Sequence, residues 1–381
     1  MKKKILFCIT NLIGGGAEKI LLDTIKYMDK NKFDIDVFTL VNEGIYIKEI
    51  KKYANYNYAF DLNKYPSFCH KYLRFLFLRY IKFSKKEKLY KKYIKNKYDF
   101  EVSYLEGPST KLIAGSSSEA MKFAWIHVDL LKLPDSRKYY RNSKEELDSY
   151  LTYDKIMCVS SDVKSSFIKI YPILENRTKI LLNVLDTNKI NSSISNTDFC
   201  KKDSRINLIT IGRLSPQKGY ERLLRCCLKL KKDGCNFKLR IAGTGLSLNE
   251  FQKYIEDNDL QQYVELLGFV SNPYKLLAES DLFVCSSITE GFSTVVSEAI
   301  YLGIPVVTTD CAGMRDILGD NEYGLIIENS EDALYFALKD LIVNPDKIRE
   351  LKFKAEKRKK FFDLNERLRD FEALFENGES K

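Results

Sequence analysis

Apolar strand-like runs that alternate with helical segments constrain the fold of this chain more than any other feature. The alternation is clearest in the second half, where we predict strands at Ile206–Ile211, Lys238–Ala242, Val264–Leu266, Leu282–Val284 and Pro305–Thr308. The segments between these runs predict helices at Gly219–Lys232, Ser247–Asn258, Pro273–Glu279 and Ser293–Tyr301. Buried strands separated by helices are typical of a parallel sheet covered by helices.

The first half of the chain follows the same pattern. We predict a helix at Ala17–Met28 and strands at Lys4–Thr10, Asp34–Leu40, Glu101–Tyr104, Lys122–Ile126 and Lys155–Val159. Residues 188–205 are rich in Ser, Asn, Asp and Lys and lack apolar periodicity, which predicts a linker. A chain of 381 residues fits two domains, here 1–187 and 206–360. Two doubly wound parallel sheets of this Rossmann-like kind predict an interdomain cleft, since ligands bind at the carboxyl ends of the strands.

Composition narrows the class of protein further. The hydrophobic share of 45% and the charged share of 30% are typical of a soluble globular protein, and no apolar run approaches the roughly 18 residues of a membrane span. The basic N-terminus imitates a signal peptide, but glycines follow its short apolar run instead of a cleavage site. The nine cysteines show no C-x-x-C or Cys/His ligand spacing, so we predict a reducing, cytoplasmic location and no metal site.

Three loops are suited to binding a diphosphate. In the first, Gly212 ends a predicted strand, and Arg213 and Lys218 follow five positions apart. Arginine supplies a planar fork of donors and lysine a point charge, and both suit a pyrophosphate leaving group. The alternative interpretation is a pair of solvated loop cations.

The second and third loops are rich in small residues at the start of a predicted helix. Gly291–Thr294 precedes one helix and Gly14–Gly16 the other, so free backbone N–H groups could hold phosphate or sugar oxygens. Lys19 stands where a dinucleotide fingerprint requires its third glycine. The pattern therefore disfavours an oxidoreductase.

Two glutamates, Glu290 and Glu298, are separated by seven residues and resemble the E-x7-E motif of glycosyltransferase family 4, which has the GT-B fold. Further stretches are similar to that family, namely the first phosphate loop, Gly243-Thr244-Gly245, Leu267–Val270, Gly303–Val307, and in the first half Gly15–Glu18 and Trp125–Asp129. The resemblance covers the second domain almost throughout and is specific for the superfamily, not for one sugar.

The resemblance implies a role for each matching position. Among catalytic groups, Arg213 and Lys218 would stabilise the departing diphosphate, His127 would contact the donor sugar near its reacting face, and Glu290 would contact hydroxyls of that sugar. Glu298 would bind the ribose, and the base would lie near Gly243 and Val270. The remaining donor-binding positions are Gly15, Gly16, Gly212, Gly291, Phe292, Ser293 and Thr294.

The activity implied is that of a retaining, metal-independent hexosyltransferase without a cofactor. It would move a hexose or N-acetylhexosamine from a nucleotide diphosphate sugar to a lipid-linked saccharide in bacterial surface polysaccharide (capsule) or glycolipid synthesis. UDP is favoured as the commoner donor nucleotide. From the residues themselves, Glu290 lies just before a helix and Glu298 about two turns into it, so both can face one cleft. Two surface carboxylates are the alternative.

A second acidic pair, Asp34 and Asp36, has the D-x-D spacing of metal-dependent transferases. Because side chains alternate along a strand, both lie on one face, which predicts a solvated rim. Dependence of activity on Mn²⁺ would contradict a metal-independent enzyme. The loop Glu106–Ser109, which follows a predicted strand, is a candidate for the acceptor side.

Residues 64–97 hold twelve Lys or Arg and one acid, Glu87, interleaved with aromatic residues. A basic amphipathic helix with an aromatic face predicts binding to an anionic membrane surface, here the inner face of the plasma membrane. The alternative is a helix that packs on the sheet and exposes its lysines to water. The same stretch is compatible with nucleic-acid binding, which we disfavour because no recognised module accompanies it.

The more serious rival to a glycosyltransferase is a nucleotide-sugar epimerase of the GT-B fold, against which the E-x7-E helix and the Arg–Lys pair argue. Residues 361–381 predict an amphipathic helix that, by the resemblance, returns to the first domain.

Overall fold

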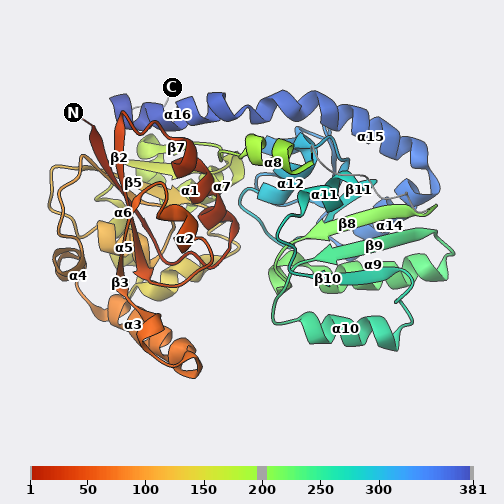
Figure 1. Ribbon diagram of the computed structural model, residues 1–381, viewed down its shortest axis with the longest axis horizontal. Coiled ribbons are helices and arrows are strands. Elements are labelled where there is room, and N and C mark those ends of the chain that lie inside the picture. The colour runs from red at the N-terminus through yellow and green to blue at the C-terminus, as the bar shows by residue number, and fades with distance from the viewer. Residues whose placement is uncertain (1, 195–203, 378–381) are drawn as a thin grey trace. The chain divides into compact units, whose positions relative to one another are not determined.

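The computed structural model describes residues 2–194 and 204–377, and the chain divides into two compact units (Figure 1). Unit 1 comprises residues 1–184 together with 364–381, and unit 2 comprises residues 185–363. Each unit is built on one sheet whose strands are all parallel. Each of these sheets is a doubly wound α/β layer, as the alternation of strands and helices predicts.

The sheet of unit 1 has the strand order β3-β2-β1-β4-β5-β6-β7. Its strands are β1 Lys3–Ile9, β2 Phe33–Val41, β3 Asn55–Phe60, β4 Phe100–Ser103, β5 Met121–Ile126, β6 Lys155–Cys158 and β7 Thr178–Ile180. The central strand β1 pairs with β2 through Ile5 and Ile35, and with β4 through Ile5 and Phe100. The order of the strands reverses between β1 and β4, and this switch point is where open α/β sheets bind ligands.

The helices of unit 1 flank this sheet. They are α1 Gly16–Tyr27, α2 Ile47–Ile50, α3 His70–Phe83, α4 Lys86–Tyr93, α5 Pro108–Ile113, α6 Ser143–Tyr150, α7 Ser161–Ile170 and α16 Leu364–Asn377. The lowest part of unit 1 in Figure 1 is α3, which projects away from the sheet.

The sheet of unit 2 has the order β10-β9-β8-β11-β12-β13, with its switch point between β8 and β11. Its strands are β8 Ile206–Ile211, β9 Phe237–Ala242, β10 Val264–Gly268, β11 Leu282–Cys285, β12 Val306–Thr309 and β13 Leu325–Ile327. Its helices are α8 Thr187–Ile194, α9 Tyr220–Lys232, α10 Leu248–Asp257, α11 Tyr274–Ala278, α12 Thr294–Tyr301, α13 Met314–Leu318, α14 Glu331–Val343 and α15 Pro345–Arg358.

Helices cover both faces of the unit 2 sheet. Successive side chains of a strand point to opposite faces and therefore enter two different cores. In β8, Leu208 belongs to the core that contains α9, whereas its neighbour Ile209 belongs to the core that contains α12. Leu282 and Phe283 of β11 alternate in the same way. This burial on two sides explains why these strands are apolar at nearly every position.

The predicted linker 188–205 is wrong in its first part. Residues 187–194 form helix α8, and Ile190 is fully buried in the core of unit 2. The division between the units accordingly falls before Leu185. Residues 195–203 lie outside the described part of the chain.

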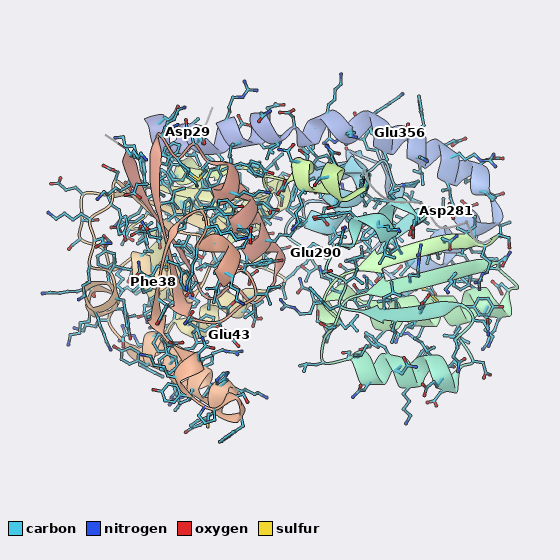
Figure 2. The ribbon with its side chains drawn as sticks, in the orientation of Figure 1. Asp29, Phe38, Glu43, Asp281, Glu290 and Glu356 are labelled. Carbon is cyan, nitrogen blue, oxygen red and sulfur yellow. The ribbon has the colours of Figure 1, made fainter. Side chains whose placement is uncertain are left out.

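Helix α16 packs on the sheet of unit 1 although it comes from the other end of the chain. The Phe375 ring lies 5.9 Å from the Phe7 ring and 5.3 Å from the Phe100 ring, and the Phe371 ring lies 5.5 Å from the Trp125 ring. The backbone N–H of Asp29 donates to the Glu372 carboxylate at 2.7 Å (Asp29 is labelled in Figure 2). The C-terminal helix thereby completes the hydrophobic core of unit 1.

Replacing Phe375 with alanine should lower the free energy of unfolding by about 3–5 kcal/mol, because it empties a fully buried site among aromatic rings. Urea unfolding of the whole chain would measure this. Phe353→Ala on α15 is the matched control, since that ring is 60% exposed and its loss should cost well under about 1 kcal/mol. A Phe375→Ala variant as stable as the Phe353→Ala variant would contradict this account.

Candidate functional site

The loops that follow β8 and β11 meet at the switch point of unit 2. Gly219, at the end of the first loop, has φ 64°, and a Cβ atom there would lie 2.1 Å from the Ser286 carbonyl oxygen. Only glycine allows both this backbone conformation and this close approach. The contact holds the loop of Arg213 and Lys218 against the loop that leads to Glu290.

An ion pair connects these two loops. Lys218 Nζ lies 2.6 Å from Glu290 Oε1, and the Ser287 hydroxyl donates to the same oxygen at 2.5 Å. Glu290, labelled in Figure 2, is only 8% exposed. Burial alone would lower the pKa of Lys218, but the attraction and hydrogen bond of Glu290 raise the pKa above the usual value for lysine. The lysine therefore stays charged at the edge of a small cavity that Ser293 and Tyr220 also line.

The second glutamate of the pair, Glu298, lies in α12 and is 3% exposed. The Tyr274 hydroxyl donates to Glu298 Oε1 at 3.2 Å. The helix begins after Ser293, which caps it by accepting the Val296 backbone N–H. Neither glutamate is a solvated surface carboxylate, so that alternative is wrong.

The other predicted donor-binding positions of unit 2 lie on the loops around the same sheet edge. Arg213 is exposed on the β8 loop. A Cβ atom at Gly243, after β9, would lie 1.8 Å from the Gly212 carbonyl oxygen, so these two glycines lie against each other. Gly291 and Ser293 are buried. Phe292, Thr294 and Val270 are partly exposed. The structure thus brings Gly212 and Gly243 together and leaves Arg213 open to solvent.

Arg222, which the sequence analysis did not identify, fixes the β11 loop. Its guanidinium donates to the Ser286 carbonyl oxygen at 2.9 and 2.6 Å and to the Ser287 carbonyl oxygen at 2.7 Å. It also donates to Asn329 Oδ1 at 2.7 Å. The side chain is 9% exposed. The one available signal was an arginine on the apolar side of an amphipathic helix, between Tyr220 and Leu223.

In unit 1, the predicted residues gather at the carboxyl edge of the central strands. Gly15 and Gly16 lie at the start of α1, after β1. His127 follows β5, and its backbone N–H donates to Glu106 Oε2 at 3.0 Å. Burial lowers the pKa of His127 to about 4, so its imidazole is neutral at physiological pH.

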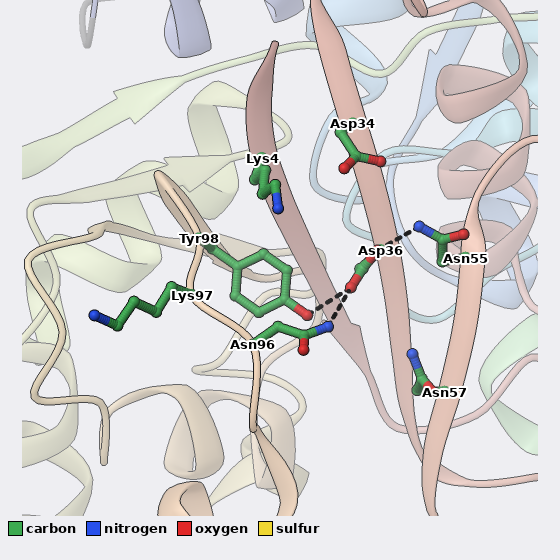
Figure 3. A pocket seen from close by; sticks show the side chains of 8 residues that line it. All are labelled: Lys4, Asp34, Asp36, Asn55, Asn57, Asn96, Lys97 and Tyr98. Carbon is green, nitrogen blue, oxygen red and sulfur yellow. Dashed lines mark hydrogen bonds between the residues drawn. The ribbon is translucent and has the colours of Figure 1, made fainter. Parts of the chain in front are cut away.

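The D-x-D pair lies at the opposite, amino edge of the same sheet, and the predicted solvated rim is wrong for Asp36, whereas Asp34 is partly exposed. Asp36 is 8% exposed and accepts hydrogen bonds from Tyr98 at 2.6 Å, Asn55 at 2.8 Å and Asn96 at 3.3 Å (Figure 3). The pocket at this edge is lined by Lys4, Asp34, Asp36, Asn55, Asn57, Asn96, Lys97 and Tyr98. The Asp36 carboxylate joins β2 and β3 to the segment before β4. Within residues 2–194 and 204–377, no group of three or more His, Cys, Asp or Glu side chains is arranged to hold a metal ion.

Solved structures place the fold. The chain superposes on HepE of Anabaena, solved with UDP and glucose, with a TM-score of 0.75 at 18% identity over 98% of this chain and 100% of HepE. The lipopolysaccharide glycosyltransferase WaaG gives a TM-score of 0.68 at 15% identity over 98% of this chain and 100% of WaaG. The fold is therefore GT-B, with two Rossmann-like parallel-sheet units.

Sequence comparison shows that the second half of the chain is similar to glycosyltransferases. Residues 197–359 match the family described as glycosyl transferases group 1. The N-acetylgalactosamine-N,N'-diacetylbacillosaminyl-diphospho-undecaprenol 4-alpha-N-acetylgalactosaminyltransferase of Campylobacter jejuni is 34% identical over 224 residues, 58% of this chain and 60% of that protein. An uncharacterized glycosyltransferase of Methanocaldococcus jannaschii is 35% identical over 204 residues, 51% of this chain and 49% of that protein. The match thus spans about half to three fifths of these relatives.

Replacing Arg222 with lysine should lower the free energy of unfolding by about 2–3 kcal/mol, because hydrogen bonds from a charged donor to buried carbonyls are lost. Thermal and urea unfolding would measure the change. Arg225→Lys, one turn along α9, is the control, since Arg225 forms a partly exposed pair with Glu331, and its loss should cost about 0.2–1 kcal/mol. Equal stability of the two variants would show that Arg222 does not hold the loop.

Proposed function

We propose that this protein is a retaining, metal-independent glycosyltransferase. It transfers a hexose or N-acetylhexosamine from a nucleoside diphosphate sugar to a lipid-linked saccharide during synthesis of a bacterial surface polysaccharide or glycolipid. The observation that carries the proposal is the Lys218–Glu290 pair, held at the switch point of unit 2 beside the start of α12. The family match over residues 197–359 covers this whole region and supports the same class of reaction.

The proposed reaction breaks the bond between the anomeric carbon and a diphosphate oxygen, and forms a bond from that carbon to an acceptor hydroxyl oxygen. The hydroxyl proton leaves with the nucleoside diphosphate. Lys218 and Arg213 neutralise the charge that develops on the departing diphosphate, which is the main electrostatic demand of the step. Because Glu290 fixes Lys218, the ammonium group needs no rearrangement when the charge develops.

The remaining residues hold the donor. Backbone N–H groups from Gly291 to Thr294 bind sugar and phosphate oxygens, as a helix start allows. Glu298 binds the ribose, while Gly243 and Val270 lie beside the base. In unit 1, Gly15 and Gly16 contact the diphosphate, and His127 contacts the transferred sugar.

Two relatives support the proposed substrates. HepE was solved with UDP, which favours UDP as the nucleotide here. The Campylobacter relative is named for an acceptor linked to diphospho-undecaprenol, which favours a lipid-linked acceptor. Both substrates belong to the proposal.

A thermal-shift panel with UDP, GDP, ADP, CDP and NAD tests the donor assignment. One nucleoside diphosphate at about 100 times its dissociation constant should add about 2.7 kcal/mol to the stability of the folded chain. The Arg213→Ala/Lys218→Ala variant should lose this shift. The control Lys232→Ala/Lys253→Ala removes two exposed lysines of the same unit and should keep it. Stabilisation by NAD alone, or by none of the nucleotides, would contradict the phosphate assignment.

Unit 1 also presents a surface suited to an anionic membrane. Phe77 and Ile81 bury one side of α3, with the Phe77 ring 4.9 Å from the Phe60 ring. The other side of α3 exposes large aromatic side chains, Tyr72 63%, Phe75 59% and Phe83 56%, and the short turn before the helix exposes Phe68 84%. The alternative of a packed helix with only lysines in water does not account for this aromatic surface. No helix within the described residues is long and apolar enough to cross a membrane.

Basic side chains surround these aromatic residues. Arg79 lies over the Phe83 ring, 5.1 Å from its centroid, and Lys92 lies 4.9 Å from that of Tyr80. Aromatic rings enter the headgroup region while lysines and arginines attract anionic lipid. We infer that the surface of residues 64–97 binds the membrane that carries the acceptor.

Flotation with phosphatidylserine-containing vesicles tests this surface. The wild-type chain should float at low salt and be released as ionic strength rises, because the attraction is screened. Phe68→Ser/Phe75→Ser/Phe83→Ser should reduce the bound fraction at least about tenfold, since each ring contributes roughly 1.5–3 kcal/mol when it is buried. The control Phe336→Ser/Phe353→Ser removes two rings of unit 2 that are 64% and 60% exposed. Failure to float at low salt, or equal flotation of all variants, would refute membrane binding.

A further inference from the structure

A carboxyl group with no part in the reaction described above lies beside His127. Glu106 stands in the loop between β4 and α5, at the switch point of the unit 1 sheet. Its Oε2 accepts the His127 backbone N–H at 3.0 Å. Glu106 is thus hydrogen-bonded directly to His127, the residue assigned to the transferred sugar.

The loop around Glu106 is held in place on several sides. Gly107 has φ 94°, and a Cβ atom there would lie 3.0 Å from the Tyr139 ring. The Tyr140 hydroxyl donates to the Gly107 carbonyl oxygen at 3.1 Å, and the Ser109 hydroxyl donates to the Leu105 carbonyl oxygen at 2.5 Å. These contacts fix the backbone from which the Glu106 carboxyl projects.

The His127 side chain offers a free hydrogen-bond acceptor. The ring lies tilted against that of Tyr104, with centroids 5.0 Å apart, and hydrogen-bonds the Tyr104 backbone. Its Nε2 is buried and has no hydrogen-bond partner within the described residues. A buried acceptor without a partner is costly, which points to a ligand hydroxyl that donates to it.

The chemistry of this cluster matches a hydroxyl better than a phosphate. The Glu106 carboxylate and the Nε2 atom of His127 both accept hydrogen bonds. Glu18 of α1 adds a further carboxylate near Glu106. The Glu106 carboxylate would repel a phosphate group placed against it, whereas a sugar hydroxyl donates to it. A hydrogen bond to a charged carboxylate is about twice as strong as one between neutral groups.

We propose that Glu106 is a further catalytic residue, whose carboxylate accepts a hydrogen bond from the attacking hydroxyl of the acceptor. This inference rests on the proposed glycosyl transfer. The acceptor oxygen bonds to the anomeric carbon, the bond to the diphosphate oxygen breaks, and the hydroxyl proton passes to the Glu106 carboxylate, which releases it to the departing nucleoside diphosphate. Glu106 orients the hydroxyl lone pair toward the carbon and is unchanged at the end of the step.

The protonation state of Glu106 gives the proposal a pH signature. Burial, with the nearby Glu18 carboxylate, raises the pKa of Glu106 to about 7. The groups of neighbouring elements that interact with it are Glu18 of α1, His127 after β5, Cys158 of β6 and Tyr150 of α6, and Lys164 of α7 interacts electrostatically with Cys158. The pKa values of Cys158 and Tyr150 are raised by burial and that of His127 is lowered, so none of these three titrates near neutral pH. Acceptance of the hydroxyl therefore requires pH above about 7.

Transfer assays on Glu106→Gln test the proposal. The probes are UDP-glucose, UDP-galactose, UDP-N-acetylglucosamine and UDP-N-acetylgalactosamine, each with undecaprenyl diphosphate N-acetylhexosamine. Relative to wild type, kcat/KM for the acceptor should fall at least about thirtyfold, while the thermal shift with UDP stays unchanged. The wild-type rate should rise with pH through about 7, and the variant should lose this rise. Glu119→Gln, an exposed glutamate of the same unit, should behave as wild type.

The outcomes separate the two proposals. A wild-type chain that transfers from none of these donors overturns the proposed function and this inference with it. A wild-type chain that transfers, with Glu106→Gln equally active or still showing the rise, overturns only the role of Glu106. Should the glutamine variant fail to fold, Glu106→Asp replaces it and should show a lower kcat/KM with the rise moved along the pH axis.

Melting curves give a readout that needs no acceptor. A carboxyl whose pKa is raised in the folded state contributes stability when it is protonated, and this contribution is lost as pH rises through about 7. Glutamine does not ionise, so Glu106→Gln should melt at a higher temperature than wild type at pH 8, and the difference should shrink at pH 5. Lower activity together with higher stability is expected of a functional residue and not of a structural one. A variant that melts lower than wild type at pH 8 would assign Glu106 a structural role.

Discussion

The close contact between the β8 and β11 loops is the constraint on which the arrangement of unit 2 depends. A side chain at Gly219 would clash with the Ser286 carbonyl oxygen. The close approach of the two loops lets Lys218 reach Glu290 across the switch point. Arg222 holds the backbone of the β11 loop through buried hydrogen bonds. In the proposed reaction, a lysine that is paired before the ligand binds is already oriented, so it would not need to reorganise as charge develops on the leaving diphosphate. Local backbone geometry and electrostatics therefore depend on one another here.

Unit 1 shows the opposite use of burial. In unit 2, Lys218 is paired with Glu290, whereas Glu106 and the Nε2 atom of His127 have no cation beside them within the described residues. Burial moves the pKa of Glu106 upward and that of His127 downward, so each is less charged than it would be in water. The buried Nε2 atom of His127 has no hydrogen-bond partner within the described residues, and a ligand bound near the switch point would satisfy it.

The strands and most helices could be predicted because their apolar patterns are local and strongly periodic. Helix α8 was not predicted, since Thr187–Ile194 is polar apart from Ile190 and Ile194, and the burial of Ile190 depends on residues such as Tyr274 and Phe283 that are distant in sequence. The D-x-D pair was misjudged for a related reason. Alternation correctly put Asp34 and Asp36 on one face, but the donors that bury Asp36, Asn55 and Tyr98 among them, come from other segments. Side-chain period identifies a face and not what covers it.

By itself, the sequence determined the two parallel-sheet units, the glycine-rich turns at strand ends and the motif that carries Glu290 and Glu298, because these depend on residue type and spacing within short windows. Tertiary structure alone decided which loops meet. The pairing of Lys218 with Glu290, the anchoring of the β11 loop by Arg222 and the hydrogen bond between Glu106 and His127 join residues that are far apart in the chain. Strand order places them together, and no local pattern encodes strand order, because a parallel sheet pairs strands through long crossover connections.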